Sequence, residues 1–405
     1  MTLSFWQRND READADCDVA VVGGGIIGCA TAYWLRRFRP ALRVALVEGG
    51  RLASGASGRN AGFLLQGAAF DYVTDRERYG AERARRLWHF TRQNRDLIAS
   101  ELRPRVFALE ASGSLAVAGT EAEDARLRAA VRWMRADGAP VAYIPPEETN
   151  RRLVGRGFYG ALYVPSGAAL HPARLVRHLA ATSGAAVYEQ HRVVALDEAG
   201  GRYVLETPVR RLWAGQVVLA LGAYLPLLVP ELGRYVRPVR AQMLATVPRP
   251  PRWLQLPAYT HDGYFYLRQT PDGTLLAGGA RHLHADAEVG YEDATTPALQ
   301  ADLEAYLHHH FPQTQGLAVR HRWSGTMGFS PDHLPVVGAV PGLPGCHWAA
   351  GFTGHGMGYG FRFGQLLAEH VLGRPHPEDF DLFTADRFER ARPTRLRTAS
   401  DAPAS

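Results

Sequence analysis

The stretch DVAVVGGGIIGCATAYWL, residues 18–35, decides the fold of the amino-terminal part of the chain. Residues 18–22 form a short apolar run, which is typical of a buried parallel strand. Gly23, Gly25 and Gly28 follow in the spacing GxGxxG, and the residues after them suit a helix packed on a sheet. The first glycine permits a tight turn, the second lets the backbone approach a pyrophosphate, and the third lets the helix pack closely on the strand. The stretch therefore predicts a strand–turn–helix unit whose helix offers free N–H groups to phosphates.

The next strand supports this reading. Residues 43–48, RVALVE, predict a second parallel strand that ends in Glu48, twenty residues after Gly28. An acid at this place accepts hydrogen bonds from ribose hydroxyls, and Ile26 and Ile27 lie in the turn beside it. A carboxylate disfavours a phosphorylated ribose, so the pattern favours FAD or NAD over NADP.

A second loop of glycines and small residues separates FAD from NAD. Residues 49–63, GGRLASGASGRNAGF, exceed what a nicotinamide dehydrogenase needs, whereas a flavin and its ribityl chain need extra support. The alternative is a surface loop without a ligand. The predicted cofactor contacts in this loop are Gly49, Arg51, Ser57, Gly58, Arg59, Asn60, Ala61 and Gly62.

Composition excludes several classes of protein. The 405 residues suggest two or three domains, and 46% hydrophobic with 21% charged residues are typical of a globular protein. The net charge is +6, yet no residue is lysine, which excludes Schiff-base chemistry through a lysine. The arginines are scattered among acids, so we expect no nucleic-acid partner.

The three cysteines form no CxxC pair, and we find no signal sequence. The longest apolar stretch, residues 217–229, is too short to span a membrane. We expect a cytoplasmic protein without stable membrane insertion.

The rest of the chain mixes helices and strands. Helices are predicted at 82–102, 120–137, 171–183 and 297–311, with Thr120 as a cap. Alternating patterns predict strands between 185 and 224, and antiparallel strands are predicted between 236 and 279.

Four segments together resemble one family. They are VVGGGIIGCATAYWL with Glu48, then GASGRNAGF, then VVLALGAY, and finally HRWSGTMGFSPDHLPVVG with AAGFTGHGMGYGF. In these, the chain resembles the FAD-dependent D-amino-acid-oxidase superfamily, which includes glycine, sarcosine and γ-glutamylputrescine oxidases. The resemblance runs over residues 16–383. It implies an α/β plus α+β fold, in which a Rossmann-like FAD-binding domain is interleaved with a substrate domain built on a mostly antiparallel sheet.

The resemblance also implies domain bounds and cofactor contacts. Residues 1–100, 155–235 and 321–390 are expected in the FAD-binding domain, 101–154 and 236–320 in the substrate domain, and 391–405 in a disordered tail. A glycine-rich helix entrance can aim N–H groups at the flavin, where negative charge develops on reduction. Further predicted contacts are Val193, Val194, Ala220, Gly222, Gly325, Gly354, His355, Gly356 and Met357.

The sequence departs from the family pattern at three positions. Gly325 replaces the cysteine that attaches the flavin in sarcosine-oxidase-like relatives, so we expect non-covalent FAD. Met327 replaces the arginine that clamps the substrate carboxylate in glycine-oxidase-like relatives, which favours amines or N-substituted substrates. Ala277 lies near the place of the lysine that promotes reaction with oxygen in sarcosine-type oxidases.

Five residues are candidates for contact with the substrate. Arg268 and Arg281 are candidates to replace the lost clamp, or are structural. Tyr264 and Tyr266 alternate with Phe265, so both are expected on one face of a strand, as a pocket wall or as core. His355 lies in the glycine-rich turn and is a candidate base or a capping residue. The run His308–His310 is interpreted as surface, and no metal site is predicted.

The resemblance, together with the glycine motifs and Glu48, implies an FAD-dependent oxidoreductase that oxidises a C–N bond of a small amine or amino acid by hydride transfer to the flavin, giving an imine that hydrolyses. Oxygen is the expected acceptor, with hydrogen peroxide as product. One alternative is a dehydrogenase of the same substrates that passes electrons to a quinone or carrier. An alternative of another class is a flavin-binding protein without turnover. The sequence leaves the oligomeric state open.

Overall fold

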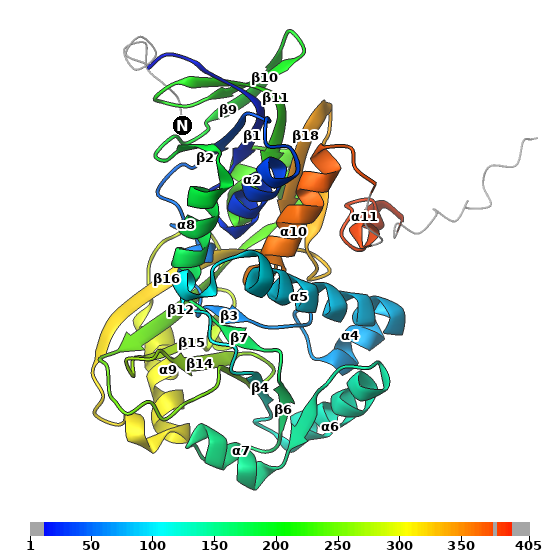
Figure 1. Cartoon of the computed structure of the whole chain (residues 1–405). Helices are drawn as coiled ribbons and strands as arrows, with labels where there is room; N and C mark the ends of the chain where they lie inside the picture. Colours follow the sequence, from blue (N-terminus) through cyan, green and yellow to red (C-terminus); the bar gives the residue numbers. More distant parts are fainter. Residues whose placement is uncertain (1–11, 376–378, 391–405) are drawn as a thin grey trace, which may run out of the picture.

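The computed structural model describes residues 12–375 and 379–390. Within these ranges the chain forms two eight-stranded sheets and a small two-stranded one. Figure 1 shows the sheets in two lobes, one above the other, with the long helix α5 crossing between them. This arrangement confirms the predicted Rossmann-like sheet combined with a second, mostly antiparallel sheet.

The first sheet has the order β17-β18-β11-β1-β2-β8, and β10 and β9 extend from β11. The strands β1, β2, β8, β11 and β18 run parallel, so their carboxyl ends meet at one edge. The strands are β1 (Ala15–Val22), β2 (Val44–Val47), β8 (Ala186–Tyr188), β9 (Ala195–Ala199), β10 (Arg202–Glu206), β11 (Arg211–Leu219), β17 (Val336–Val340) and β18 (Leu343–Ala350).

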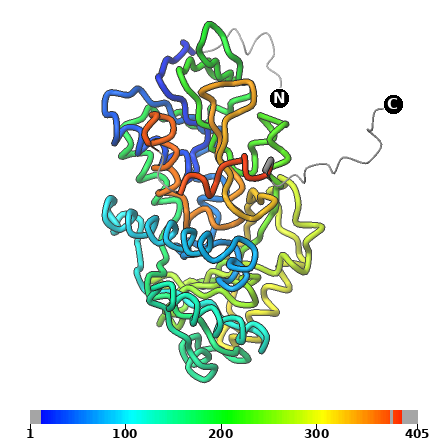
Figure 2. The backbone as a smooth tube through the Cα atoms, turned by 90° about the vertical axis from the view of Figure 1, so that its right-hand side faces the viewer, coloured from blue at the N-terminus to red at the C-terminus, as the bar shows by residue number. Residues whose placement is uncertain are grey.

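Both faces of this sheet are buried, which explains the uninterrupted apolar strands. Val19 and Val21 pack with the helices on one face, while Ala20 and Val22 belong to a separate core on the other. The covering helices are α2 (Ile26–Phe38), α8 (Pro172–Ser183) and α10 (Gly356–Val371). In Figure 2 the blue amino-terminal segment and the orange carboxy-terminal segment again share one lobe, so residues more than 300 positions apart build one layer.

The second sheet has the order β16-β12-β15-β14-β13-β4-β6-β5, and its pairs are antiparallel except β13 with β4. Helix α9 (Pro297–His310) covers one face. The strands are β4 (Ser114–Val117), β5 (Ala142–Ile144), β6 (Ala161–Val164), β12 (Arg237–Thr246), β13 (Ala258–Thr260), β14 (Phe265–Gln269), β15 (Leu275–Gly279) and β16 (Val319–Phe329).

The remaining helices and strands lie outside the two large sheets. Helix α6 begins as predicted, because Thr120 accepts a hydrogen bond from the Glu123 N–H and Glu123 accepts one from the Gly119 N–H. The other helices are α3 (Ala56–Arg59), α4 (Tyr72–Tyr79), α5 (Ala81–Glu101), α6 (Glu121–Ala136), α7 (Pro146–Leu153) and α11 (Arg387–Arg390); β3 (Phe63–Leu64) pairs with β7 (Ala168–Ala169).

Sheet membership differs from the predicted domain bounds at two strands. β6 pairs with β4 and β5 in the second sheet, although the range 155–235 was assigned to the cofactor domain. β16 pairs with β12 over its whole length, so residues 321–329 also belong to the second sheet. Both strands are placed in the second sheet by pairing with strands distant in the sequence, β4 for β6 and β12 for β16, which the local sequence does not reveal. The predicted tail 391–405 lies outside the described residues. No helix in the described part of the chain is long and apolar enough to cross a membrane.

Candidate active site

The glycine turn lies at the carboxyl edge of the first sheet. A Cβ on Gly28 would lie 1.9 Å from the carbonyl oxygen of Gly23, so helix α2 can approach the turn only with glycine there. Gly23 has φ +116°, and a Cβ on it would lie 2.4 Å from the carbonyl oxygen of Ala220. Ala220 follows β11, and Gly222, with φ +55°, begins the next turn. The predicted residues of β1 and β11 therefore meet at one edge.

Glu48 is fixed beside this turn. Its Oε2 accepts a hydrogen bond from the Gly24 N–H and its Oε1 accepts one from the Gly50 N–H, each at 2.7 Å. The segment that contains Val193 and Val194 passes the same place, since a Cβ on Gly49 would lie 3.3 Å from the Arg192 Cβ. The Val194 N–H donates to the carbonyl oxygen of Glu206, the last residue of β10, so this N–H is already bonded within the protein.

The loop 49–63 closes over the turn and is tied to both lobes. Ser57 Oγ accepts the Ile26 N–H at 2.9 Å, so one of the helix donors expected to face a phosphate is already used by the chain. The Asn60 amide donates to two carbonyls of α3 and accepts the Gly62 N–H, which shapes the loop internally. Arg51 is exposed.

Arg59 joins this loop to the second sheet. Its guanidinium contacts the Asp293 carboxylate at 2.6 Å and donates to the Ser324 carbonyl at 3.0 Å. The Trp323 indole N–H donates to the Arg59 carbonyl at 2.8 Å. A Cβ on Gly325 would lie 3.2 Å from the Arg59 Cβ, so position 325 faces the loop.

The glycine-rich turn before α10 lies between the two sheets. Gly354 has φ +80°, and a Cβ there would lie 3.4 Å from the Met327 sulfur. The His355 Nδ1 donates to the Thr353 carbonyl at 2.9 Å, because a carbonyl can only accept, and this leaves Nε2 as the acceptor. Burial lowers the pKa of His355, so the neutral imidazole is favoured.

One row of residues crosses the second sheet on the face toward this turn. Trp323 pairs with Met243, Met243 with Gly278, Gly278 with Tyr266, and Tyr266 with Tyr259. Gly278 gives space to its neighbour, because a Cβ there would lie 2.4 Å from the Tyr266 ring. These side chains pack with Ala61 and Phe63 of the loop.

Two tyrosines form an aromatic wall in this row. The Tyr259 ring lies 6.0 Å from Tyr266, 5.2 Å from Phe63 and 6.4 Å from the His355 ring. Burial raises the pKa of Tyr266 to about 12 and raises that of Tyr259 as well, so both phenols stay protonated at neutral pH. The sequence analysis missed Tyr259, Phe63, Met243 and Trp323; strand alternation in AYT, residues 258–260, was the available signal for Tyr259.

Arg281 lies at the edge of the aromatic wall. Its guanidinium carbon is 5.1 Å from the centre of the Phe329 ring, and among the described residues Arg281 makes no hydrogen bond or ion pair. Its positive charge acts to lower the pKa of Tyr266 and of His333. The structure therefore leaves one of the two predicted arginines with a positive charge that no described carboxylate neutralises.

Arg268 and Tyr264 differ from their predicted roles. Arg268 is buried, its Nη2 lies 3.1 Å from the Glu110 carboxylate, and its Nη1 donates to the Leu170 and Gly62 carbonyls, so it holds the protein together rather than offering a free clamp. Tyr264 lies in the turn before β14, is 44% exposed, and packs on His282 at 4.3 Å. The strand begins one residue later than the alternation suggested.

Two further positions need correction. Ala277 packs in the core on the opposite face of the sheet, with Leu267 and Leu244, so a lysine there would not face the aromatic wall. His310 is buried rather than on the surface: it stacks on Phe158 at 4.5 Å, and its Nδ1 donates to the Arg156 carbonyl. In the described ranges, no group of histidines, cysteines and acids is arranged to hold a metal.

Comparison with known proteins identifies the family. The model of the family described as "FAD dependent oxidoreductase" matches residues 18–370, which is most of the chain. The chain belongs to this family. FAD is therefore its cofactor, as the glycine turn, Glu48 and the loop 49–63 together predicted.

Similar members of this family come from several bacteria. The chain is 28% identical to gamma-glutamylputrescine oxidoreductase of Escherichia coli over 91% of this chain and 86% of the relative. It is 29% identical to glycine oxidase of Geobacillus kaustophilus over 91% and 97%. The crystal structure of that glycine oxidase superposes with a TM-score of 0.79 and covers 91% of this chain and 98% of its own.

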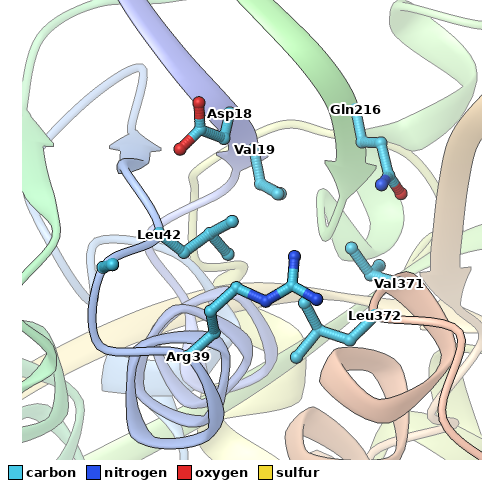
Figure 3. Close-up of a pocket in the computed structure, with 8 residues that line it drawn as sticks. Asp18, Val19, Arg39, Leu42, Gln216, Val371 and Leu372 are labelled. Atoms are coloured by element: carbon cyan, nitrogen blue, oxygen red, sulfur yellow. The ribbon is translucent and has the colours of Figure 1, made fainter.

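The residues present fit FAD at the carboxyl edge of the first sheet. The turn is rich in glycine, and at Gly23 and Gly28 an added Cβ would collide with a backbone carbonyl oxygen. Glu48 lies beside the turn, bound to the Gly24 N–H. Non-covalent attachment, expected from Gly325, stays a prediction. A separate hollow of about 410 Å³ lies toward the amino ends of β1 and β11. Figure 3 shows Arg39 reaching toward Leu372 in this hollow, whose lining includes no residue of the glycine turn.

Proposed function

We propose that this FAD dependent oxidoreductase oxidises the C–N bond of a small amine that carries a carboxylate, such as an amino acid or an N-substituted amino acid. The carbon loses a hydride and the nitrogen a proton, and water hydrolyses the resulting imine. FAD supplies the acceptor for the hydride when it is bound. The names of two relatives, glycine oxidase and gamma-glutamylputrescine oxidoreductase, support an amine or amino-acid substrate.

The guanidinium of Arg281, unpaired among the described residues, is the observation that supports a carboxylate on the substrate. A guanidinium without a described carboxylate partner, placed against Phe329 beside the aromatic wall, suits a planar anion. Met327 adds an apolar surface next to Gly354, where relatives resembling glycine oxidase have their arginine. The clamp is thus proposed to come from the turn after β15 instead of from β16.

His355 and the two wall tyrosines serve the amine end. With its Nδ1 proton donated to Thr353, His355 has Nε2 available to accept a hydrogen bond from the substrate N–H. The lowered pKa of His355 keeps that nitrogen unprotonated at neutral pH. The aromatic wall of Tyr259 and Tyr266 excludes water, and their rings suit an amine held against them.

The proposal also names the acceptor of the electrons from the reduced flavin. We propose oxygen, with hydrogen peroxide as product. The alternative is a dehydrogenase. The chain contains no lysine, so it lacks the ammonium group that promotes the oxygen reaction in sarcosine-type relatives. Rapid return of the oxidised flavin colour in air supports an oxidase, whereas slow return with fast dye reduction supports a dehydrogenase.

An anaerobic titration tests the substrate class. The purified protein, loaded with FAD, is mixed with amino acids of both hands, N-methylated amino acids and amines that lack a carboxylate, and flavin absorbance is followed. We expect bleaching by one group of carboxylate-bearing amines. Flavin that stays oxidised with all of them would overturn the proposal and favour a binding protein without turnover.

A further inference from the structure

The first turn of α10 is the only part of that helix predicted to meet FAD. His355 precedes the helix, and Gly356, Gly358 and Gly360 lie in its first five residues. Donors at this place favour flavin reduction only when they point at the ring, because hydrogen bonds weaken steeply with angle and distance. The position of this turn along the helix axis therefore affects the cofactor directly.

Asn94 of α5 is inserted into the hydrogen bonds of α10. In a regular helix the Phe361 N–H would donate to the Met357 carbonyl. The Asn94 amide binds both of these groups: its Oδ1 accepts the Phe361 N–H at 2.8 Å and the Arg362 N–H at 3.0 Å, and its Nδ2 donates to the Met357 carbonyl at 3.1 Å. Asn94 is 0% exposed, so no water competes for these bonds. A side chain inserted in this way displaces one helical turn relative to the next.

Helix α2 holds the same point from the other side. The Trp34 indole N–H donates to the Phe361 carbonyl at 3.1 Å. Both backbone groups of Phe361 are thus bound by side chains of other helices. The two helices touch closely here, because a Cβ on Gly360 would lie 2.4 Å from the Ile26 side chain. The first turn of α10 is therefore fixed against α2, whose own amino end forms the glycine turn.

We propose that Asn94 is a positioning residue for the flavin: its amide, together with Trp34, sets where the first turn of α10 lies and so how its N–H groups meet the cofactor. Asn94 itself lies behind the turn, and acts through Met357 and Phe361. The proposal rests on the predicted contact between this turn and FAD, and it holds for any substrate.

The test compares Asn94→Leu with a matched control, Asn150→Leu. Asn150 of α7 also makes three hydrogen bonds, to the Pro146 and Phe158 carbonyls and from the Phe158 N–H, but it lies in the far lobe. For each variant, the Kd of FAD for the apoprotein, the reduction potential of the bound flavin and the thermal midpoint are measured. A leucine has nearly the same shape but no hydrogen-bonding groups, so the comparison isolates the amide.

We expect Asn94→Leu to weaken FAD binding roughly tenfold and to lower the preference for reduced over oxidised flavin roughly tenfold, which corresponds to a potential about 30 mV more negative. Asn150→Leu lowers the thermal midpoint and leaves the potential unchanged. Trp34→Phe keeps an aromatic ring but loses the N–H, and we expect it to shift the potential in the same direction by a smaller amount. If Asn94→Leu does not fold, the potential of Trp34→Phe is the deciding measurement.

A wild-type potential in Asn94→Leu, or in Trp34→Phe when only that variant folds, would overturn the proposal and leave Asn94 a purely structural residue. This outcome is distinct from failure of the proposed function, in which wild-type flavin is not reduced by any carboxylate-bearing amine, whatever its potential.

Discussion

The carboxyl edge of the first sheet and the facing surface of the second sheet owe their shapes to different parts of the chain. At the edge, the shape comes from backbone, and an added Cβ at Gly28 or Gly58 would lie 2.0 Å or less from a carbonyl oxygen. On the facing surface, the shape comes from large side chains, Trp323, Tyr266 and Tyr259. The first surface therefore tolerates almost no substitution, whereas the second can change its ligand by changing side chains.

The largest effect is expected at the edge. Gly28→Ala places a methyl group 1.9 Å from the Gly23 carbonyl oxygen, which forces the turn apart. We expect loss of bound FAD and a destabilisation of about 1–3 kcal/mol. Gly55→Ala, in the adjoining loop with open space around it, is the control, and we expect it to keep both its bound FAD and its stability. The ratio of flavin to protein absorbance measures the outcome, and a fully loaded Gly28→Ala protein would refute the backbone account.

The next effect, on stability alone, is expected where the two surfaces are joined. Glu110→Gln leaves the buried Arg268 and its neighbour Arg252 without their carboxylate, and Arg268 holds the loop at Gly62. We expect a loss of up to about 3 kcal/mol in the free energy of unfolding. Glu148→Gln breaks only surface ion pairs and costs about 0–1 kcal/mol. Denaturant unfolding measures both, and equal losses would show that Arg268 does not need its partner.

The facing surface is tested by two tyrosines. Tyr259→Leu removes a ring of the aromatic wall, and we expect kcat/KM to fall about tenfold, equal to about 1.4 kcal/mol, with FAD binding retained. Tyr264→Leu, on the exposed turn, is expected to change kcat/KM little. Steady-state kinetics distinguish them, and the reverse order would restore the strand assignment that the sequence suggested.

The smallest effect concerns a buried acid on α4, beside the helix that crosses between the lobes. Asp75 is 2% exposed, and burial raises its pKa well above the usual value of 3.8. The folded state therefore holds the proton of Asp75 more tightly than the unfolded state. The contribution of Asp75 to stability is fully present below the unfolded pKa and is lost as pH rises through the folded pKa.

Asp75→Asn keeps the neutral shape and removes this dependence. We expect its thermal midpoint to exceed that of the wild type by several degrees at pH 8 and to converge with it near pH 4. Asp197→Asn, on an exposed strand, serves as the control. Parallel midpoint curves for Asp75→Asn and the wild type would show that Asp75 is ionised in the folded protein.

The same contrast explains what the sequence could predict. Gly23, Gly25, Gly28 and Glu48 lie within one strand–turn–helix–strand unit, so local spacing was enough to place them. Tyr259 and Trp323 are brought together only by the order of strands in the second sheet, which no local pattern encodes.

The sequence could not show which arginine is free to bind a ligand, for a related reason. Arg268 and Arg281 both flank the strand pair in sequence, and only the position of Glu110, more than 150 residues away, separates the bound arginine from the free one. The face of Ala277 was likewise fixed by strand register rather than by its neighbours in sequence.

Arg281 is proposed to bind the carboxylate of the substrate. The most direct measurement compares Arg281→Met with the wild type on one amine substrate and on its carboxamide, following anaerobic flavin reduction, with Arg320→Met on the exposed part of β16 as control. We predict that Arg281→Met loses roughly 100-fold on the carboxylate, since a charge-assisted bond contributes about 1.5–3 kcal/mol, and loses little on the carboxamide. Equal rates for wild type and Arg281→Met on the carboxylate would contradict the account.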